Sequence, residues 1–312
     1  MEGKRLPPVH EPLTRGTGTE RLIGSLARAR KKSGREPHPA ASSPTIVYPR
    51  LMPREWNAAT YHRVSGPQVS WGRKVLARVH LEGNETLLDA GCGTGRLTED
   101  LLEALPTGRV VGVDLSQNML CAAREHLAPH AAKAAFVVAD LESLPFERVF
   151  DGVFSTAAFH WVTDHDCLFR SLFRALKPGG WLVAQCGGGA NLARLRERAR
   201  ALGATPKFAS YLGIYREPWE YADAETTAAR LRRAGFENIT TGLEAAPTVF
   251  ESAEKFSEFI RNVVFHRHLE CIPDPPLREE FIAILTRQAT EDDPACCLDY
   301  WRLNLEAYVP AK

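Results

Sequence analysis

Short apolar runs alternate with amphipathic segments over residues 86–186, and this alternation constrains the fold more than any other feature. Five runs rich in Val, Leu, Ala and Phe predict strands at 86–90, 109–114, 134–140, 150–155 and 179–186. Between them, apolar residues at helical spacing predict helices at about 94–105, 116–128 and 164–176. Strands joined by helical crossovers lie parallel and are covered on both faces. The pattern therefore predicts an α/β fold with a doubly wound parallel sheet.

After residue 190 the alternation loosens. Helical patterns continue at 190–203, 223–234, 251–263 and 277–290, and strand patterns at 236–244 and 298–309. The last strand lies too near the end of the chain for another helical crossover, so we expect an antiparallel edge of the sheet. Residues 249–292 then form a helical cap, inserted between the last two strands of a single domain that spans 52–312.

Residues 1–51 differ in composition from the rest of the chain. The first 50 residues hold ten Lys or Arg, four Glu and seven of the 21 prolines. Such a segment buries too little apolar surface to fold, so we expect a disordered basic extension. The four glutamates argue against a mitochondrial address in "RLIGSLARARKK". A start of translation at Met52 stays open.

The composition disfavours several classes of function. No apolar run approaches the ~18 residues that span a bilayer, so no membrane partner is expected. The seven cysteines are scattered and never form C-x-x-C. They indicate neither a disulfide framework nor a metal site, which favours the cytoplasm. Beyond residue 50 the chain is slightly acidic and has no basic stripe, so nucleic acid is not an expected partner. The oligomeric state stays open.

The stretch "LLDAGCGTGRLT" follows the first predicted strand and carries three glycines at alternating positions: Gly91, Gly93 and Gly95. Glycine permits positive φ and lets a ligand approach the backbone closely. The dinucleotide fingerprint requires a further glycine where Arg96 stands. Asp89 lies at the entrance of the loop, where it would repel a pyrophosphate but attract a cation such as a sulfonium.

Two further carboxylates end the next two predicted strands. Asp114 is placed to accept hydrogen bonds from ribose hydroxyls, a role shared by NAD and S-adenosylmethionine sites. Asp140 is placed to accept from an adenine amino group, with a helix-capping aspartate as the alternative.

These residues stand in five ordered motifs that resemble those of class I S-adenosylmethionine-dependent methyltransferases. The motifs include "LLDAGCGTGRLTEDL", "VVGVDLSQNML", "FVVADLESLPF", "FDGVFSTAAFHWV" and "LFRALKPGGWLVA". The resemblance implies a seven-stranded sheet with its last strand antiparallel, and S-adenosyl-L-methionine as cofactor. The cofactor-binding residues that it implies are Asp89, Gly91, Cys92, Gly93 and Gly95 around the methionine end, Asp114 at the ribose, Leu115 and Met119 against the adenine, Asp140 and Leu141 at the adenine edge, and Ser155 and Thr156 near the sulfonium.

Two flanking segments, "EWNAATYHRV" and "AAFHWVTDH", resemble trans-aconitate methyltransferases and, more distantly, malonyl-carrier-protein methyltransferases. Those relatives methylate carboxylates. The resemblance therefore implies a small-molecule methyl acceptor, with the oxygen of a carboxylic acid as the favoured site.

A carboxylate nucleophile is already ionised, so it needs a cationic anchor rather than a base. The candidate anchors are Arg216, Arg261 and Arg267, with His266 and His268 nearby. The alternative for the "FHRH" segment is a solvated helix end.

His160 follows the fourth strand, where the acceptor site of this class opens. We favour a pocket-lining role for it, with Trp161 as a wall, over general-base catalysis. Trp56 and Tyr61 are expected in a lid, or else in plain helix packing.

Several functions stay open beside carboxylate methylation. A natural-product or quinone O- or C-methyltransferase would use His160 as its base. A non-catalytic S-adenosylmethionine-binding subunit would keep the glycine loop alone, and an NAD-dependent oxidoreductase ranks last.

Overall fold

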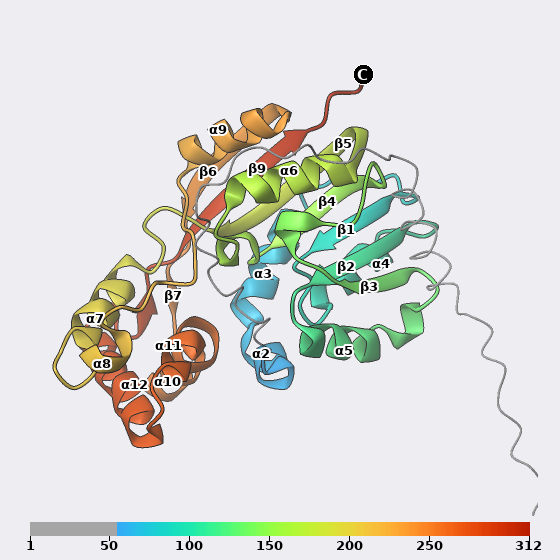
Figure 1. Cartoon of the computed structure of the whole chain (residues 1–312). Coiled ribbons are helices and arrows are strands. Elements are labelled where there is room, and N and C mark those ends of the chain that lie inside the picture. The colour runs from blue at the N-terminus through green and yellow to red at the C-terminus, as the bar shows by residue number, and fades with distance from the viewer. Residues whose placement is uncertain (1–54) are drawn as a thin grey trace, which may run out of the picture.

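A seven-stranded sheet in the order β3-β2-β1-β4-β5-β9-β6 forms the centre of the computed structural model, which describes residues 55–312 (Figure 1). The expected extension over residues 1–51 lies outside the described part of the chain. The strands are β1 (Thr86–Ala90), β2 (Arg109–Asp114), β3 (Ala134–Val138), β4 (Phe150–Thr156), β5 (Leu176–Gly187), β6 (Glu237–Ala245) and β9 (Trp301–Tyr308). Parallel pairing joins the neighbours from β3 to β5, whereas β9 runs antiparallel to both β5 and β6. The predicted doubly wound fold and its antiparallel last strand are confirmed.

The central strands β1, β2 and β4 form because most of their residues are buried on both faces of the sheet. Leu87 and Leu88 are adjacent in β1 and point to opposite faces, yet neither is exposed to solvent. Leu87 joins a core shared with Val75, Leu101 and Leu120, and Leu88 joins the opposite core. Strands buried in this way require apolar residues at successive positions rather than at alternate ones.

Helices cover each face of the sheet. The helices α3 (Gly66–Leu76), α4 (Arg96–Glu103) and α5 (Gln117–His126) contribute to one core, and α6 (His165–Ala175) and α9 (Ala224–Ala234) to the other. Before the sheet lies α2 (Ala58–Val64), and single turns stand at Ala128–His130, Leu141–Ser143 and Phe159–Trp161. Asp164 and Asp223 begin α6 and α9 by accepting backbone N–H groups in the first turn, as helix N-caps do. No helix in residues 55–312 is long and apolar enough to cross a bilayer.

A second group of helices forms a cap with its own apolar core (Figure 1). It comprises α7 (Ala193–Gly203), α8 (Ala209–Leu212), α10 (Ala253–Phe259), a π-helical turn (Ile260–Val264), α11 (His266–Glu270) and α12 (Pro275–Thr290). The first two helices follow β5 and the others lie between β6 and β9, so two separate segments build the cap. Apolar spacing predicted helices at α7, α10 and α12 but neither the short α8 and α11 nor this pairing, because the pairing depends on tertiary contacts.

A small two-stranded sheet was also absent from the sequence analysis. The strands β7 (Thr248–Val249) and β8 (Cys297–Leu298) pair antiparallel where the chain enters and leaves the second cap segment. Two residues per strand are too few to show a hydrophobic period, so the sequence carries no pattern for them.

Candidate active site

The glycine loop passes between β1 and α4 in a conformation that side chains would oppose. Gly91 and Gly95 both have φ of +82°, and a Cβ on Gly91 would lie 2.2 Å from the Cβ of Ala158. The N–H of Gly91 donates to the carbonyl of Val113 at the end of β2 (2.8 Å). Gly93 has φ of +54° and open space where its Cβ would be. The loop thus turns tightly and presents bare backbone to the adjoining pocket.

Asp114 holds this loop against the end of β2. One carboxylate oxygen accepts the N–H of Gly93 (3.0 Å) and the other accepts the N–H of Ser116 (2.9 Å). Burial raises the pKa of Asp114, and these hydrogen bonds oppose that shift.

Asp89 is the second buried carboxylate beside the loop. Burial, opposed by a hydrogen bond from the Thr98 hydroxyl (2.6 Å) and assisted by the charge of Asp114, raises its pKa to about 7. No described cation contributes to its pKa. The site therefore holds a carboxyl group that would ionise readily once a positive charge lies next to it.

The residues expected at the adenine end follow β2 and β3 in the chain. Leu115 is 46% exposed, whereas Met119 and Leu141 are buried. Asp140 accepts the backbone N–H of Glu142 (2.9 Å) and so caps a short helical turn, the alternative that the sequence left open.

The serine and threonine that end β4 are placed differently from each other. The buried Ser155 hydroxyl donates to the carbonyl of Ala90 (2.6 Å), which ties β4 to β1. Thr156 lines the pocket beside the glycine loop, together with Asp89 and Cys92.

Sequence reasoning did not identify Glu55, which attaches the N-terminal segment to the start of α5. Its carboxylate accepts the Ser116 hydroxyl (2.6 Å) and the N–H groups of Gln117 (3.1 Å) and Asn118 (2.9 Å). A helix N-terminus stabilises an anion in this position. The motif "EWNAATYHRV" drew attention to this segment, but only the fold shows which helix the glutamate reaches.

Glu55 positions the neighbouring Trp56 across the mouth of a second pocket. The ring of Trp56 lies 5.5 Å from Tyr61, 5.4 Å from Trp161 and 4.1 Å from His266 of the cap, measured between ring centroids. These contacts bring Trp56, Tyr61, Trp161 and His266 together, although they come from three distant parts of the sequence.

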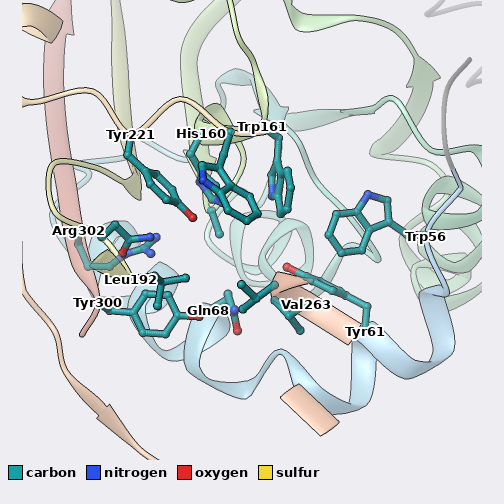
Figure 2. A pocket seen from close by; sticks show the side chains of 14 residues that line it. Trp56, Tyr61, Gln68, His160, Trp161, Leu192, Tyr221, Val263, Tyr300 and Arg302 are labelled. Carbon is teal, nitrogen blue, oxygen red and sulfur yellow. The ribbon is translucent and has the colours of Figure 1, made fainter. Parts of the chain in front are cut away.

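The second pocket adjoins the glycine-loop pocket, and the two share Tyr61, Gln68 and Ala157 in their walls. Its other walls are largely aromatic (Figure 2). We call it the aromatic pocket and define it by its lining residues: Trp56, Tyr61, Gln68, Ala157, His160, Trp161, Asn191, Leu192, Trp219, Tyr221, Val263, Val264, Tyr300 and Arg302.

Arg302 is the residue of this pocket that the sequence analysis missed. Only 3% of it is exposed, and its guanidinium stacks on the rings of Trp71 (4.5 Å) and Tyr300 (5.9 Å). Figure 2 shows the guanidinium between Tyr221 and Tyr300, directed toward the middle of the pocket. Burial lowers its pKa, no described carboxylate offsets this effect, and its Nε atom has no hydrogen-bond partner among the described residues.

The arginines that the sequence suggested as anchors lie elsewhere. Arg261 forms a bidentate ion pair with Glu279 (2.7 and 2.6 Å), and Arg216 is exposed. Arg267 stacks on Trp161 (5.6 Å). None of the three is among the residues that line the aromatic pocket. The "FHRH" segment lies beside this pocket, because His266 contacts the rings of Trp56 and Trp161.

His160 lines the pocket as a neutral ring. Its Nδ1 accepts the N–H of Gly187 (3.3 Å), so the neutral imidazole carries its proton on Nε2. Burial lowers the pKa of His160 well below its ordinary value, and the charge of Arg302 lowers it further. At neutral pH the ring is therefore a hydrogen-bond donor with a poor ability to take up a proton.

The three tyrosines of the pocket also stay protonated. Burial raises the pKa of Tyr61 to about 12 and raises those of Tyr221 and Tyr300 as well. The aromatic pocket thus contains a cation and hydrogen-bond donors, and among its lining residues no group is suited to act as a base near pH 7.

Comparison with known proteins agrees with this geometry. Residues 87–180 match a family model described as a methyltransferase domain. The trans-aconitate 2-methyltransferase of Variovorax paradoxus is 39% identical over 132 residues, which cover 42% of this chain and 49% of the relative. That of Methylobacterium radiotolerans is 35% identical over 185 residues, covering 56% and 69%. The chain spans about half the length of several such relatives.

Among solved structures, phosphoethanolamine N-methyltransferase 2 of Haemonchus contortus, in complex with S-adenosyl-L-methionine, shares the fold. Its TM-score is 0.52 at 20% identity, and the match covers 81% of this chain and 56% of that one.

A parallel sheet with an antiparallel β9, a glycine loop after β1 and an acidic residue at the end of β2 define the class I S-adenosylmethionine-dependent methyltransferases. The chain belongs to this family. Within the family it is similar to the trans-aconitate 2-methyltransferases, and the family predicted from the sequence is confirmed.

Replacing Asp89 by asparagine should stabilise the ligand-free protein in a pH-dependent way. Between about pH 4 and 7 the folded chain keeps a proton on Asp89 that the unfolded chain releases, so folding becomes less favourable as the pH rises. Asp89→Asn removes this penalty. Its free energy of unfolding should match that of the wild type near pH 4 and exceed it by up to about 4 kcal/mol above pH 7.

Urea denaturation at pH 4.5, 6 and 8 measures this difference. A difference that does not grow with pH would contradict the raised pKa of Asp89.

Proposed function

We propose that this protein transfers the methyl group of S-adenosyl-L-methionine to the carboxylate oxygen of a small-molecule acid. The observation that carries the proposal is the aromatic pocket, which offers a buried cation and no base. A carboxylate is ionised at neutral pH and needs orientation rather than deprotonation. A phenol, alcohol or amine would need a proton acceptor, and the lining residues supply none.

The glycine-loop pocket fits the cofactor of the family. S-adenosyl-L-methionine supplies an electrophilic methyl group on a sulfonium. The bare backbone of Gly91 and Gly93 permits close approach, and Asp114 ends β2 where a ribose would lie. Asp89 offers a carboxylate to the positive charge, and the resulting release of its proton should make binding tighter as the pH rises toward 7.

The aromatic pocket supplies the acceptor side. Arg302 would bind the carboxylate through its guanidinium, and His160 and the tyrosine hydroxyls can donate further hydrogen bonds. Tyr61, Gln68 and Ala157 lie where the two pockets join, so an acid held by Arg302 can face the methyl group. Trp56 and the cap would shield this junction from water. The relatives named trans-aconitate 2-methyltransferases support an acid as acceptor.

Replacing Arg302 by methionine should lower the methyltransferase activity and raise the stability of the ligand-free protein. The change removes the cation that holds the acceptor, so kcat/KM for methyl-ester formation should fall at least about 100-fold. The same change replaces an unpaired buried charge with an apolar chain of similar length, so the ligand-free protein should gain about 1–4 kcal/mol of stability. Transfer of a labelled methyl group and urea denaturation measure the two effects.

The matched control is Arg261→Met, which removes the guanidinium that pairs with Glu279 outside the pocket. Its kcat/KM should stay within about threefold of the wild type, because exposed ion pairs contribute little. Loss of activity in the Arg261 variant and not in the Arg302 variant would refute the assignment of the anchor.

His160→Asn tests whether the histidine acts as a base. The asparagine Oδ1 can accept the Gly187 N–H in place of Nδ1, so activity on an acid should stay within about 10-fold of the wild type. A general base would instead contribute about 100-fold or more. The measurement is kcat/KM from pH 6 to 9 for both proteins, and a loss of that larger size in the variant would restore the base mechanism.

A further inference from the structure

The aromatic pocket contains a single permanent charge. Among its lining residues Arg302 is the one arginine or lysine, and no aspartate or glutamate lies among them. An acceptor with one carboxylate would therefore neutralise the pocket. Each additional carboxylate would leave a negative charge in a buried site that holds no second cation to receive it.

The arginines around the pocket do not supply that second cation. Arg196 stacks on the outer face of Tyr221 (5.0 Å), and its guanidinium pairs with Glu217 (Nε to Oε2, 3.0 Å). Arg267 stacks on Trp161 but is not part of the lining. Arg96 lies on the glycine-loop side, where it donates to the carbonyl of His62 (3.1 Å).

The uncharged polar groups of the pocket carry no charge that could pair with a second carboxylate, and two of them are engaged within the protein. Asn191 accepts the N–H of Trp301 (2.9 Å), and the indole N–H of Trp219 donates to Glu217 (3.2 Å). The Oε1 atom of Gln68 is buried without a hydrogen-bond partner in the described chain. This oxygen can accept a hydrogen bond from a hydroxyl of a ligand but does not compensate a second buried negative charge.

The remaining walls are suited to an apolar body. Six aromatic residues line the pocket: Trp56, Tyr61, Trp161, Trp219, Tyr221 and Tyr300. Several of them contact one another at ring-centroid distances of 5.4 to 5.8 Å, so they form a continuous surface. Such surfaces bind flat or extended apolar groups and gain free energy by removing them from water.

We infer that the methyl acceptor is a monocarboxylic acid with an aromatic or extended apolar body, whereas di- and tricarboxylic acids are rejected. This inference rests on the proposed carboxylate methylation and narrows its substrate class. It also separates this chain from the relatives named for trans-aconitate, a tricarboxylic acid.

Matched pairs of acids test the inference. Octanoate is compared with octanedioate, 3-phenylpropanoate with its 4-carboxy derivative, and both monoacids with trans-aconitate, by transfer of a labelled methyl group. We expect each monoacid to exceed its matched diacid, and to exceed trans-aconitate, by at least about 100-fold in kcat/KM. Equal or better use of trans-aconitate or of the diacids overturns the inference, while the proposed carboxylate methylation stands.

A different outcome would overturn the proposed function itself. If none of the acids is methylated while phenols or amines are, the reaction is not carboxylate methylation. Binding gives a second readout, because Trp56, Trp161 and Trp219 line the pocket. With S-adenosylhomocysteine present, monoacids should change the tryptophan fluorescence of the wild type and leave that of Arg302→Gln unchanged. An equal response to the diacids would count against the inference.

A second cation in the pocket should shift the preference. Gln68→Lys places an ammonium beside the junction of the two pockets, and Gln68→Met is the uncharged control of similar length. The ratio of monoacid to diacid kcat/KM should fall at least about 10-fold in the lysine variant relative to the methionine variant. An unchanged ratio would show that charge does not determine the choice of acceptor.

Discussion

A buried guanidinium without a carboxylate partner in the described chain is the constraint on which the architecture of the acceptor side depends. Arg302 stands in β9, between β5 and β6, and pairs in register with Gly187, the last residue of β5. Because β9 runs antiparallel, its beginning lies at the carboxyl ends of the parallel strands, where ligands bind in this fold. If β9 were parallel, its last residues rather than Arg302 would lie at this edge of the sheet. The reversed strand thus brings a residue close to the C-terminus to the same edge as the glycine loop.

The two pockets follow one electrostatic principle with opposite signs. Asp89 beside the glycine loop and Arg302 in the aromatic pocket are both buried, and neither has a counter-charge among the described residues. Burial raises the pKa of the first and lowers that of the second, because it destabilises the charged form of each group until a ligand supplies the opposite charge. A sulfonium would supply the positive charge beside Asp89, and a carboxylate would supply the negative charge beside Arg302. Methyl transfer from the sulfonium to the carboxylate neutralises both of these ligand charges. Unpaired ions destabilise the ligand-free fold, and their retention is better explained by ligand binding than by stability.

The sequence predicted the cofactor half more completely than the acceptor half, for physical reasons. The glycines, Asp89 and Asp114 lie within one strand–loop–helix unit and the next strand, so local spacing places them. Arg302 depends on the register of β9 against two strands that lie more than 100 and about 60 residues earlier in the chain. The cap segment around the motif "FHRH" offered Arg261 and Arg267, but Arg261 pairs with Glu279, a contact that no local pattern shows. The contacts of Glu55 could not be predicted from local sequence either, because its partners begin a helix that lies 61 to 63 residues further along the chain.

The chemistry of the acceptor also depends on a contact that the sequence does not encode locally. His160 could serve as a base or as a donor, and its position after β4 permits both. The choice is made by the N–H of Gly187, which occupies the Nδ1 lone pair and leaves the proton on Nε2. Arg302 acts in the same direction, because a cation nearby makes protonation of the imidazole still less favourable. The end of β5 and the start of β9 therefore both disfavour His160 as a base, which supports the proposal that the nucleophile enters this pocket already ionised.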